Sequence, residues 1–366
     1  MAVTKHAFSP DGKIDEYVLR NSAGTKVYVT TWGARLTRFV VRDKTGTFRD
    51  IVAGFESYEK WVASLDIDDP YFGATVGRVA GRIHPCDRVE IGGQYYALSE
   101  NQPNKVCLHG GNTGFDKRVF TARVVQAPTA ASVEFTYVSE DGEEGFPGTM
   151  ELRVTYSLDN EDDALHIEYH GQLLTGTESI ANPTNHTYWN LTGFDEPTIH
   201  NHVCWLAADH YMRTRDDPAM TPDGRLLPTK NNTKLDFSTP HTFGRDLDSF
   251  DKDTYRGFDH VFVNGDGGLL AGGAVRKVAV VLSPQSGLRL TVLSDQPALV
   301  VYTGNWISDG LVGKYGVQYG NHAAVALETQ GLANAPNIPQ FRDQVTLTKD
   351  KPLYHHTVYR VDVVKP

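Results

Sequence analysis

Apolar and polar side chains alternate with a period of two along much of this chain, most clearly in its second quarter. Four such runs follow one another at residues 119–125, 132–138, 150–158 and 164–173, and glycine, proline and acidic residues separate them. A period of two is typical of strands that are buried on one face. Because glycine and proline mark turns, the pattern predicts an antiparallel meander with no helix in it.

Strands are expected on both sides of this meander as well. Gly92 and Gly93 suit the positive φ angles of a two-residue turn, so residues 87–98 predict a hairpin. The other expected strands are β-branched or apolar runs at residues 26–31, 35–41, 277–283, 287–294, 298–302, 323–327 and 357–364.

Only one segment has a helical pattern, residues 57–64, with Ser57 as a candidate N-cap. No internal repeat, low-complexity tract or linker-like shift in composition divides the chain. We therefore expect an all-β fold of large antiparallel sheets with very few short helices, forming one domain over residues 1–366.

Composition excludes several classes of function. The chain has 366 residues, of which 35 are basic and 45 acidic, giving a net charge of -10 without any run of Lys or Arg. Nucleic acid is therefore not expected as a partner. No stretch approaches the ~18 apolar residues of a membrane span, and the N-terminus lacks the apolar core of a signal peptide.

Cysteine usage and glycosylation motifs indicate in which cellular compartment the protein is expected. Cys86, Cys107 and Cys204 are an odd number without Cys-x-x-Cys spacing, so neither a disulfide framework nor a structural metal site is expected. Asn185 and Asn190 begin sequons that a secreted protein would expose to glycosylation. A glycan there would cover a segment with the composition of a binding site, which favours a cytoplasmic location.

That segment, residues 182–193, combines amides, hydroxyls, His186 and two large aromatic side chains between Pro183 and Gly193. Such a sequence makes a poor core strand, because nearly every side chain needs a polar partner. It suits a surface that binds a polar ligand such as a sugar, beside which one histidine moves a proton near neutral pH. The alternative is a turn-rich connection in which His186 has only a structural role.

Two glycine-rich segments could lie against the same ligand. Residues 77–83 carry Arg78 and Arg82, which would share a face of an extended segment, or would be two surface arginines beside a turn. Residues 108–116 place His109 among three glycines, which let a backbone approach a ligand closely. The second segment lacks the strand, helix and Gly-Lys-Ser/Thr ending of a phosphate loop.

Two carboxylates stand at predicted strand ends. Asp259 begins a strand, as a ligand or as a surface residue in a capped turn. Glu328 follows the wholly apolar run 323–327 and is held at the exit of a buried strand. Because partial burial tunes proton affinity, Glu328 is the best candidate for a general base.

The local sequences of these segments resemble those of the aldose 1-epimerase (galactose mutarotase) family. The similar motifs are Gly-Arg-Val-Ala-x-Arg-Ile at 77–83, Leu-His-Gly-Gly with Gly-Phe-Asp-Lys at 108–117, Asn-x-Thr-Asn-His-x-Tyr-x-Asn-Leu-x-Gly at 182–193, Gly-Phe-Asp-His at 257–260 and Leu-Glu-Thr-Gln at 327–330. They occur in the family's order across nearly the whole chain. The resemblance implies a β-supersandwich, no cofactor or metal, and interconversion of the α and β anomers of a free hexose such as D-galactose or D-glucose.

The resemblance also implies roles for individual residues. Glu328 would remove the proton from the C1 hydroxyl and His186 would protonate the ring oxygen, so that the sugar opens and recloses. The implied substrate-binding residues are Arg82, His109, Asp259, Gln296 and Asn185. From their residue type alone, Phe115, Trp189 and Trp306 are candidates for the apolar side of the sugar.

One departure from the family pattern concerns Gly81, where the family usually carries asparagine. The missing amide bears on which sugar is preferred and not on the reaction, because the implied acid and base are both present. An epimerase for another aldose or for a hexose 6-phosphate is an alternative, and the second would need cations such as Arg78, Arg88, Lys117 or Arg118. Further alternatives are a non-catalytic sugar-binding protein and a polysaccharide-processing enzyme on a similar sandwich. We expect a monomer or a weak homodimer.

Overall fold

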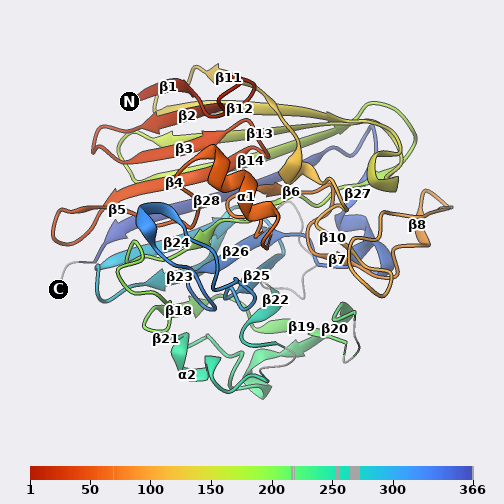
Figure 1. The fold of residues 1–366 in the computed structure, drawn as a ribbon. Coiled ribbons are helices and arrows are strands. Elements are labelled where there is room, and N and C mark those ends of the chain that lie inside the picture. Colours follow the sequence, from red (N-terminus) through yellow and green to blue (C-terminus); the bar gives the residue numbers. More distant parts are fainter. Residues whose placement is uncertain (69, 216, 218, 252–254, 264–272, 365–366) are drawn as a thin grey trace.

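A nine-stranded antiparallel sheet forms the largest layer of the computed structural model, which describes residues 1–68, 70–215, 217, 219–251, 255–263 and 273–364 (Figure 1). Its strands, in spatial order, are β11 (Thr121–Val125), β12 (Ala130–Ser139), β13 (Met150–Asp159), β14 (Ala164–Leu173), β28 (Leu353–Val363), β24 (Leu288–Ser294), β23 (Arg276–Leu282), β18 (Val203–Leu206) and β21 (His241–Thr242).

The predicted meander is confirmed as β11 to β14, in which successive strands pair as antiparallel neighbours. In β13 buried and half-buried residues alternate along the whole strand, as the period of two requires. β28 pairs with both β14 and β24, so the last strand of the chain lies inside this sheet.

Two further antiparallel sheets pack against this layer. The first contains β1 (Ala2–Ala7), β2 (Asp15–Arg20), β3 (Lys26–Thr30), β4 (Arg35–Arg42) and β5 (Phe48–Asp50). The second contains, in spatial order, β17 (Tyr188–Trp189), β26 (Val325–Gln330), β25 (Ala298–Tyr302), β22 (Asp259–Val263), β19 (His210–Thr214) and β20 (Pro222–Pro228).

Buried aromatic contacts join the layers. The ring of Trp189 in β17 lies 4.9 Å from Tyr359 in β28 and 5.8 Å from Phe39 in β4. Tyr17 in β2 lies 5.9 Å from Phe135 in β12. The expected sandwich of large antiparallel sheets is confirmed.

Short strand pairs and helices connect the sheets. The pairs are β6 (Thr75–Val76) with β16 (Thr184–Asn185), β7 (Arg82–Ile83) with β10 (Cys107–Leu108), β8 (Val89–Ile91) with β9 (Gln94–Tyr96), and β15 (Ser179–Ile180) with β27 (Thr346–Leu347). The helices are α1 (Tyr58–Leu65), α2 (Gly244–Leu247) and the 3-10 turns η1 (Phe115–Lys117), η2 (Glu143–Gly145), η3 (Thr229–Asn231), η5 (Lys314–Gly316), η6 (Ala335–Asn337) and η7 (Arg342–Gln344).

Local expectations are largely confirmed. The Ser57 side chain caps α1 by accepting a hydrogen bond from the backbone N–H of Lys60. Gly92 and Gly93 have φ angles of 58° and 77° in the turn between β8 and β9. No helix in the described ranges is long and apolar enough to cross a membrane.

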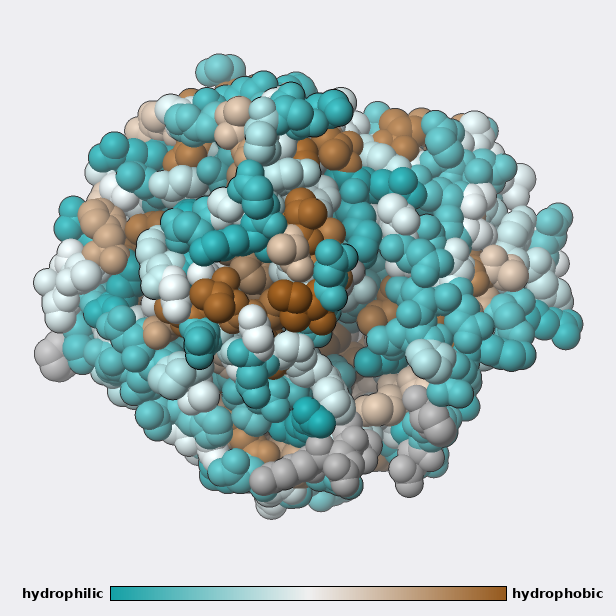
Figure 2. Space-filling view, in the orientation of Figure 1, coloured by the Kyte–Doolittle hydropathy of each residue, from teal (hydrophilic) through white to brown (hydrophobic). Residues whose placement is uncertain are grey.

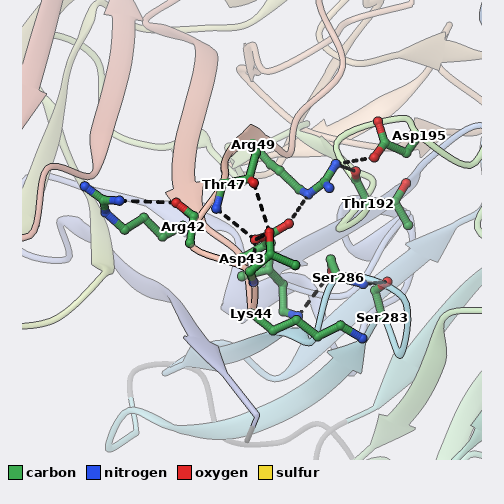
Figure 3. A network of polar contacts seen from close by, with 12 residues as sticks. Arg42, Asp43, Lys44, Thr47, Arg49, Thr192, Asp195, Ser283 and Ser286 are labelled. Carbon is green, nitrogen blue, oxygen red and sulfur yellow. Dashed lines mark hydrogen bonds and ion pairs between the residues drawn. The ribbon is translucent and has the colours of Figure 1, made fainter.

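The polar segment 182–193 is fixed at its end by a network beside the turn between β4 and β5 (Figure 3). Arg49 forms ion pairs with Asp43 and Asp195 and donates a 3.0 Å hydrogen bond to the backbone oxygen of Thr192. The backbone N–H of Lys44 bonds the oxygen of Ser286, which joins this turn to the β23–β24 turn. Arg49 thus holds the end of the segment carrying His186, and the turn before Arg49 is joined in turn to the β23–β24 turn.

Candidate active site

A pocket opens where β7, β22, β25 and β26 meet, and Figure 2 shows a hollow in the face of the molecule at this place. Five residues singled out from the sequence line it together: Arg82, His109, His186, Asp259 and Glu328. They come from five separate segments of the chain, so the fold brings together what the sequence spreads over 247 positions, from 82 to 328.

The centre of the pocket is a pair formed by Glu328 and His186. The Nε2 atom of His186 lies 3.4 Å from Oε1 of Glu328, and each side chain is only 4% exposed. Burial, reinforced by the nearby charge of Asp259, raises the pKa of Glu328 to about 8, although Arg82 opposes the shift. Burial lowers the pKa of His186 to about 4. At neutral pH the pair therefore holds one proton, on the carboxyl group.

The backbone explains why these two side chains meet. Every residue of β26 is buried, and Glu328 sits opposite Val300 of β25 in the antiparallel register. His186 follows β16, where its backbone exchanges hydrogen bonds with Ala74 and Gly73. Its ring stacks on Tyr188 at a centroid distance of 4.9 Å, which fixes the direction in which the imidazole points.

His109 lies beside His186 and presents a hydrogen-bond donor. The ring centroids are 5.2 Å apart, and the backbone N–H of Gly81 donates to Nδ1 of His109 over 3.2 Å. Burial and the neighbouring His186 keep the pKa of His109 well below its usual value. The ring is therefore neutral with its proton on Nε2, because Nδ1 acts as an acceptor.

The glycine after His109 is required by close packing. A Cβ atom on Gly110, whose φ is 91°, would lie 1.8 Å from the backbone oxygen of Gly77. Only glycine fits there, which explains the glycine-rich sequence around His109.

Arg82 and Asp259 form a polar pair at a more exposed part of the pocket. Arg82 Nη1 lies 3.6 Å from Oδ2 of Asp259, and its Nε donates a 3.3 Å hydrogen bond to Gln102. Their side chains are 26% and 24% exposed, so both have polar atoms within reach of a ligand. The pair supplies donors and acceptors for hydroxyl groups.

Two expected ligands lie outside the pocket lining. Asn185 is buried, and its amide nitrogen donates to the backbone oxygen of Gly73 and to the hydroxyl of Tyr156. Gln296 is buried and donates to Asp295 Oδ1 over 2.9 Å. Neighbouring residues in an extended segment project to opposite sides, so Asn185 faces the core while His186 faces the pocket.

The aromatic expectations divide in the same way. Trp189 and Phe115 lie in the main core, whereas Trp306 lines the pocket and is 45% exposed. The sequence reasoning missed Tyr71, Tyr188 and Tyr302, which also line it. Tyr188 could have been found because it stands two residues after His186 and therefore shares its side of the chain. Tyr71 carries no comparable sequence signal.

Both alternatives for Arg78 and Arg82 are wrong, because the two side chains do not share a face and Arg78 is not at the surface. Arg78 is 2% exposed, and its guanidinium donates to the backbone oxygens of Pro147 and Gly148 and to the side chain of Ser139. Gly81, with a φ of 73°, turns the chain before Arg82 enters β7. Arg78 therefore stabilises the connection between β12 and β13 instead of lining the pocket.

Cations for a phosphate group are scarce. Among the described residues that line the pocket, Arg82 is the single arginine or lysine. Arg78 is buried elsewhere, and Lys117 forms an ion pair with Asp116. The described residues also contain no group of three or more His, Cys, Asp or Glu arranged to hold a metal ion.

Comparison with known proteins accounts for this arrangement. A family model described as aldose 1-epimerase matches residues 15–360. The chain belongs to the aldose 1-epimerase family.

Relatives of this aldose 1-epimerase family member cover nearly its whole length. Galactose mutarotase of Mus musculus is 36% identical over 364 residues, 98% of each chain, and aldose 1-epimerase of Escherichia coli K12 is 32% identical over 338 residues, 92% of this chain and 91% of the relative. The crystal structure of galactose 1-epimerase from Lactobacillus acidophilus NCFM superposes with a TM-score of 0.82 at 26% identity, covering 100% of both chains.

Proposed function

We propose that the protein is a mutarotase that interconverts the α and β anomers of free hexoses such as D-galactose and D-glucose. Membership of the aldose 1-epimerase family supports the reaction. The contact between Glu328 and His186 is the observation that carries the mechanism, because mutarotation needs one acid and one base on the two oxygens of one carbon.

The chemistry begins with the single proton of the pair. Its transfer from Glu328 to His186 over the 3.4 Å between them gives a carboxylate and an imidazolium. Glu328 then takes the proton of the C1 hydroxyl while His186 protonates the ring oxygen. The C1–O5 bond breaks to give the open-chain aldehyde.

Rotation about the C1–C2 bond presents the other face of the aldehyde. In the reverse step Glu328 returns its proton to the aldehyde oxygen, which becomes the C1 hydroxyl, and His186 takes the proton of the C5 hydroxyl as it closes the ring. Reclosure leaves the carboxylate and imidazolium from which ring opening began, and return of the proton from His186 to Glu328 restores the resting pair. No electron leaves the sugar. Positioned proton transfer contributes roughly 10²–10⁴-fold to such a step.

The remaining groups of the pocket hold the sugar. The Nε2–H of neutral His109 and the guanidinium of Arg82 donate to oxygens near the ring oxygen, and Asp259 accepts from ring hydroxyls. Trp306, which is 45% exposed, offers an aromatic face to the CH groups of the ring. A site with a single lysine or arginine among its described lining residues supports a neutral sugar in preference to a hexose 6-phosphate.

We also propose one domain and a cytoplasmic location. The pairing of β28 with β14 in the nine-stranded sheet, and of β6 with β16 in a short two-stranded sheet, connects distant parts of the sequence. Asn185 and Asn190 are 3% and 0% exposed, so neither sequon is accessible for a glycan in the folded protein. All three cysteines are free and buried, as is usual in a reducing compartment.

Polarimetry on freshly dissolved α-D-galactose and α-D-glucose tests the function. The protein is expected to accelerate the decay of optical rotation of both sugars, above the spontaneous rate in the same buffer. If α-D-glucose 6-phosphate were accelerated instead, the sugar class would be wrong. If rotation decayed at the spontaneous rate with all three sugars, the proposed catalysis would be wrong.

A further inference from the structure

Gln330 is a buried polar residue of the pocket that the proposed mechanism does not use. It ends β26, two positions after Glu328, so both side chains project to the same side of the strand. Gln330 lines the pocket and is 1% exposed. Neither Nε2 nor Oε1 of its amide has a hydrogen-bond partner among the described residues.

A buried amide with neither end hydrogen-bonded is uncommon, because its polar atoms lose their hydrogen bonds to water without replacement. The surroundings of Gln330 supply none. Ala298 lies directly opposite across β25, and Ala333 and Val300 also line the pocket nearby. An amide kept in this position is suited to bind something that enters the pocket.

Gly81 lies beside this amide. A Cβ atom built on Gly81 would lie 3.9 Å from Nε2 of Gln330 and 3.5 Å from Cβ of Ala333. Any longer side chain at position 81 would extend into the space in front of the amide. With glycine there, no side chain from position 81 lies against the amide, and Gly81 also adjoins His109, whose Nδ1 accepts from the Gly81 N–H.

We propose that Gln330 determines sugar specificity by hydrogen-bonding ring hydroxyls of the aldose through both ends of its amide. The side-by-side donor and acceptor of a carboxamide match two neighbouring hydroxyl groups, each of which donates and accepts. The proposed ligand class is therefore fully hydroxylated aldoses, selected against their deoxy derivatives. This inference rests on the proposed mutarotase function.

The experiment compares Gln330→Met with Gln296→Met, which removes a buried amide that is already bonded to Asp295 and lies outside the pocket lining. Methionine has a similar length and no amide. The readouts are Tm and kcat/KM, measured by polarimetry on D-galactose and on its 2-deoxy, 3-deoxy and 4-deoxy derivatives.

Gln330→Met is expected to keep or raise Tm, because it removes an unpartnered buried amide. Its kcat/KM for D-galactose should fall about 10-fold or more, while at least one deoxy derivative should lose far less, so that the wild-type preference shrinks. Gln296→Met should lower Tm and leave the ratios between the sugars as in the wild type.

Two results would overturn the inference while the wild type is an active mutarotase. One is a Gln330→Met variant that loses activity equally on D-galactose and on every deoxy derivative. The other is a Tm that falls as far as in Gln296→Met with the sugar preference intact, which would make Gln330 structural. A wild type that accelerates none of the sugars would instead contradict the proposed function itself.

Discussion

Oε1 of Glu328 lies 3.4 Å from Nε2 of His186, and both groups are almost completely withdrawn from water. Burial favours the neutral form of each group, so it shifts the two pKa values in opposite directions. The result at neutral pH is a protonated carboxyl group on Glu328 beside a neutral imidazole on His186. Such a pair serves as acid and base in either direction of a reversible reaction.

Replacement of Glu328 by glutamine should nearly abolish mutarotation. The amide keeps the shape of the side chain but does not accept the C1 proton, so kcat should fall about 10²–10⁴-fold. Polarimetry on α-D-galactose measures this loss. Glu16→Gln is the control, because Glu16 is a half-buried carboxylate that accepts a hydrogen bond from Thr37 in the five-stranded sheet, and this variant should retain activity. Activity of Glu328→Gln within a few-fold of the wild type would exclude Glu328 as the base.

The pH dependence of kcat/KM should be a plateau bounded by the two shifted pKa values. Below pH about 4 His186 is protonated as well as Glu328. Above pH about 8 Glu328 loses its proton, and neither group can then act as the acid. Activity should fall on both sides, because the reaction needs a pair with one proton. Initial rates at low sugar concentration, corrected for the spontaneous rate, measure the profile. An acidic limb near pH 6.5, the value of an exposed histidine, would contradict the burial argument.

Arg78 and Arg82 should behave in opposite ways despite their closeness in sequence. Arg78→Met removes a buried guanidinium that satisfies backbone oxygens of Pro147 and Gly148, so the free energy of unfolding should drop by about 3 kcal/mol or more. Arg82→Met should change stability little, because Arg82 is 26% exposed, yet lower kcat/KM. Urea unfolding and polarimetry on both variants separate the two effects. Equal loss of stability in both would contradict the different placement of the two side chains.

The sequence predicted the meander β11 to β14 and the β8–β9 hairpin because their signal is local. Alternating burial along β13 follows from side chains that point to opposite faces, and the turn between β8 and β9 follows from Gly92 and Gly93. β28 shows where this fails. It begins at Leu353, whereas the sequence predicted a start at residue 357. The prediction missed this start because buried positions of the strand include the polar residues His355 and Thr357, which hydrogen-bond one another and Thr329. Polar residues on a buried face hide the period of two.

The direction of each side chain in the pocket could not be read in the same way. The family resemblance implied Asn185 and Gln296 as ligands, but the amide of the first donates to Tyr156 and that of the second to Asp295. Gln330 was passed over, although it shares the face of Glu328, because only the fold shows that its amide has no partner among the described residues. Irregular backbone, such as the left-handed φ at Gly81, is what the sequence pattern does not encode.

Asparagine at position 81 should partly rescue the loss caused by Gln330→Met. Gly81 has a φ of 73°, a conformation that asparagine adopts more readily than most residues. A Cβ atom there would have only ordinary contacts with Ala333 and Gln330, so Gly81→Asn should fold, at a cost of about 1 kcal/mol. Its amide would enter the space in front of Gln330 and offer the same kind of hydrogen bond to a ring hydroxyl.

The double variant tests this directly. Gly81→Asn combined with Gln330→Met should have a higher kcat/KM on D-galactose than Gln330→Met alone, by about 5-fold or more. Gly93→Asn is the matched control, because Gly93 has a similar φ of 77° but lies in the β8–β9 turn with nothing within 4 Å of its Cβ position. It should rescue nothing. If Gly81→Asn and Gly93→Asn had the same effect in the Gln330→Met background, an amide at position 81 would not replace the hydrogen bond that Gln330 is proposed to make with the sugar.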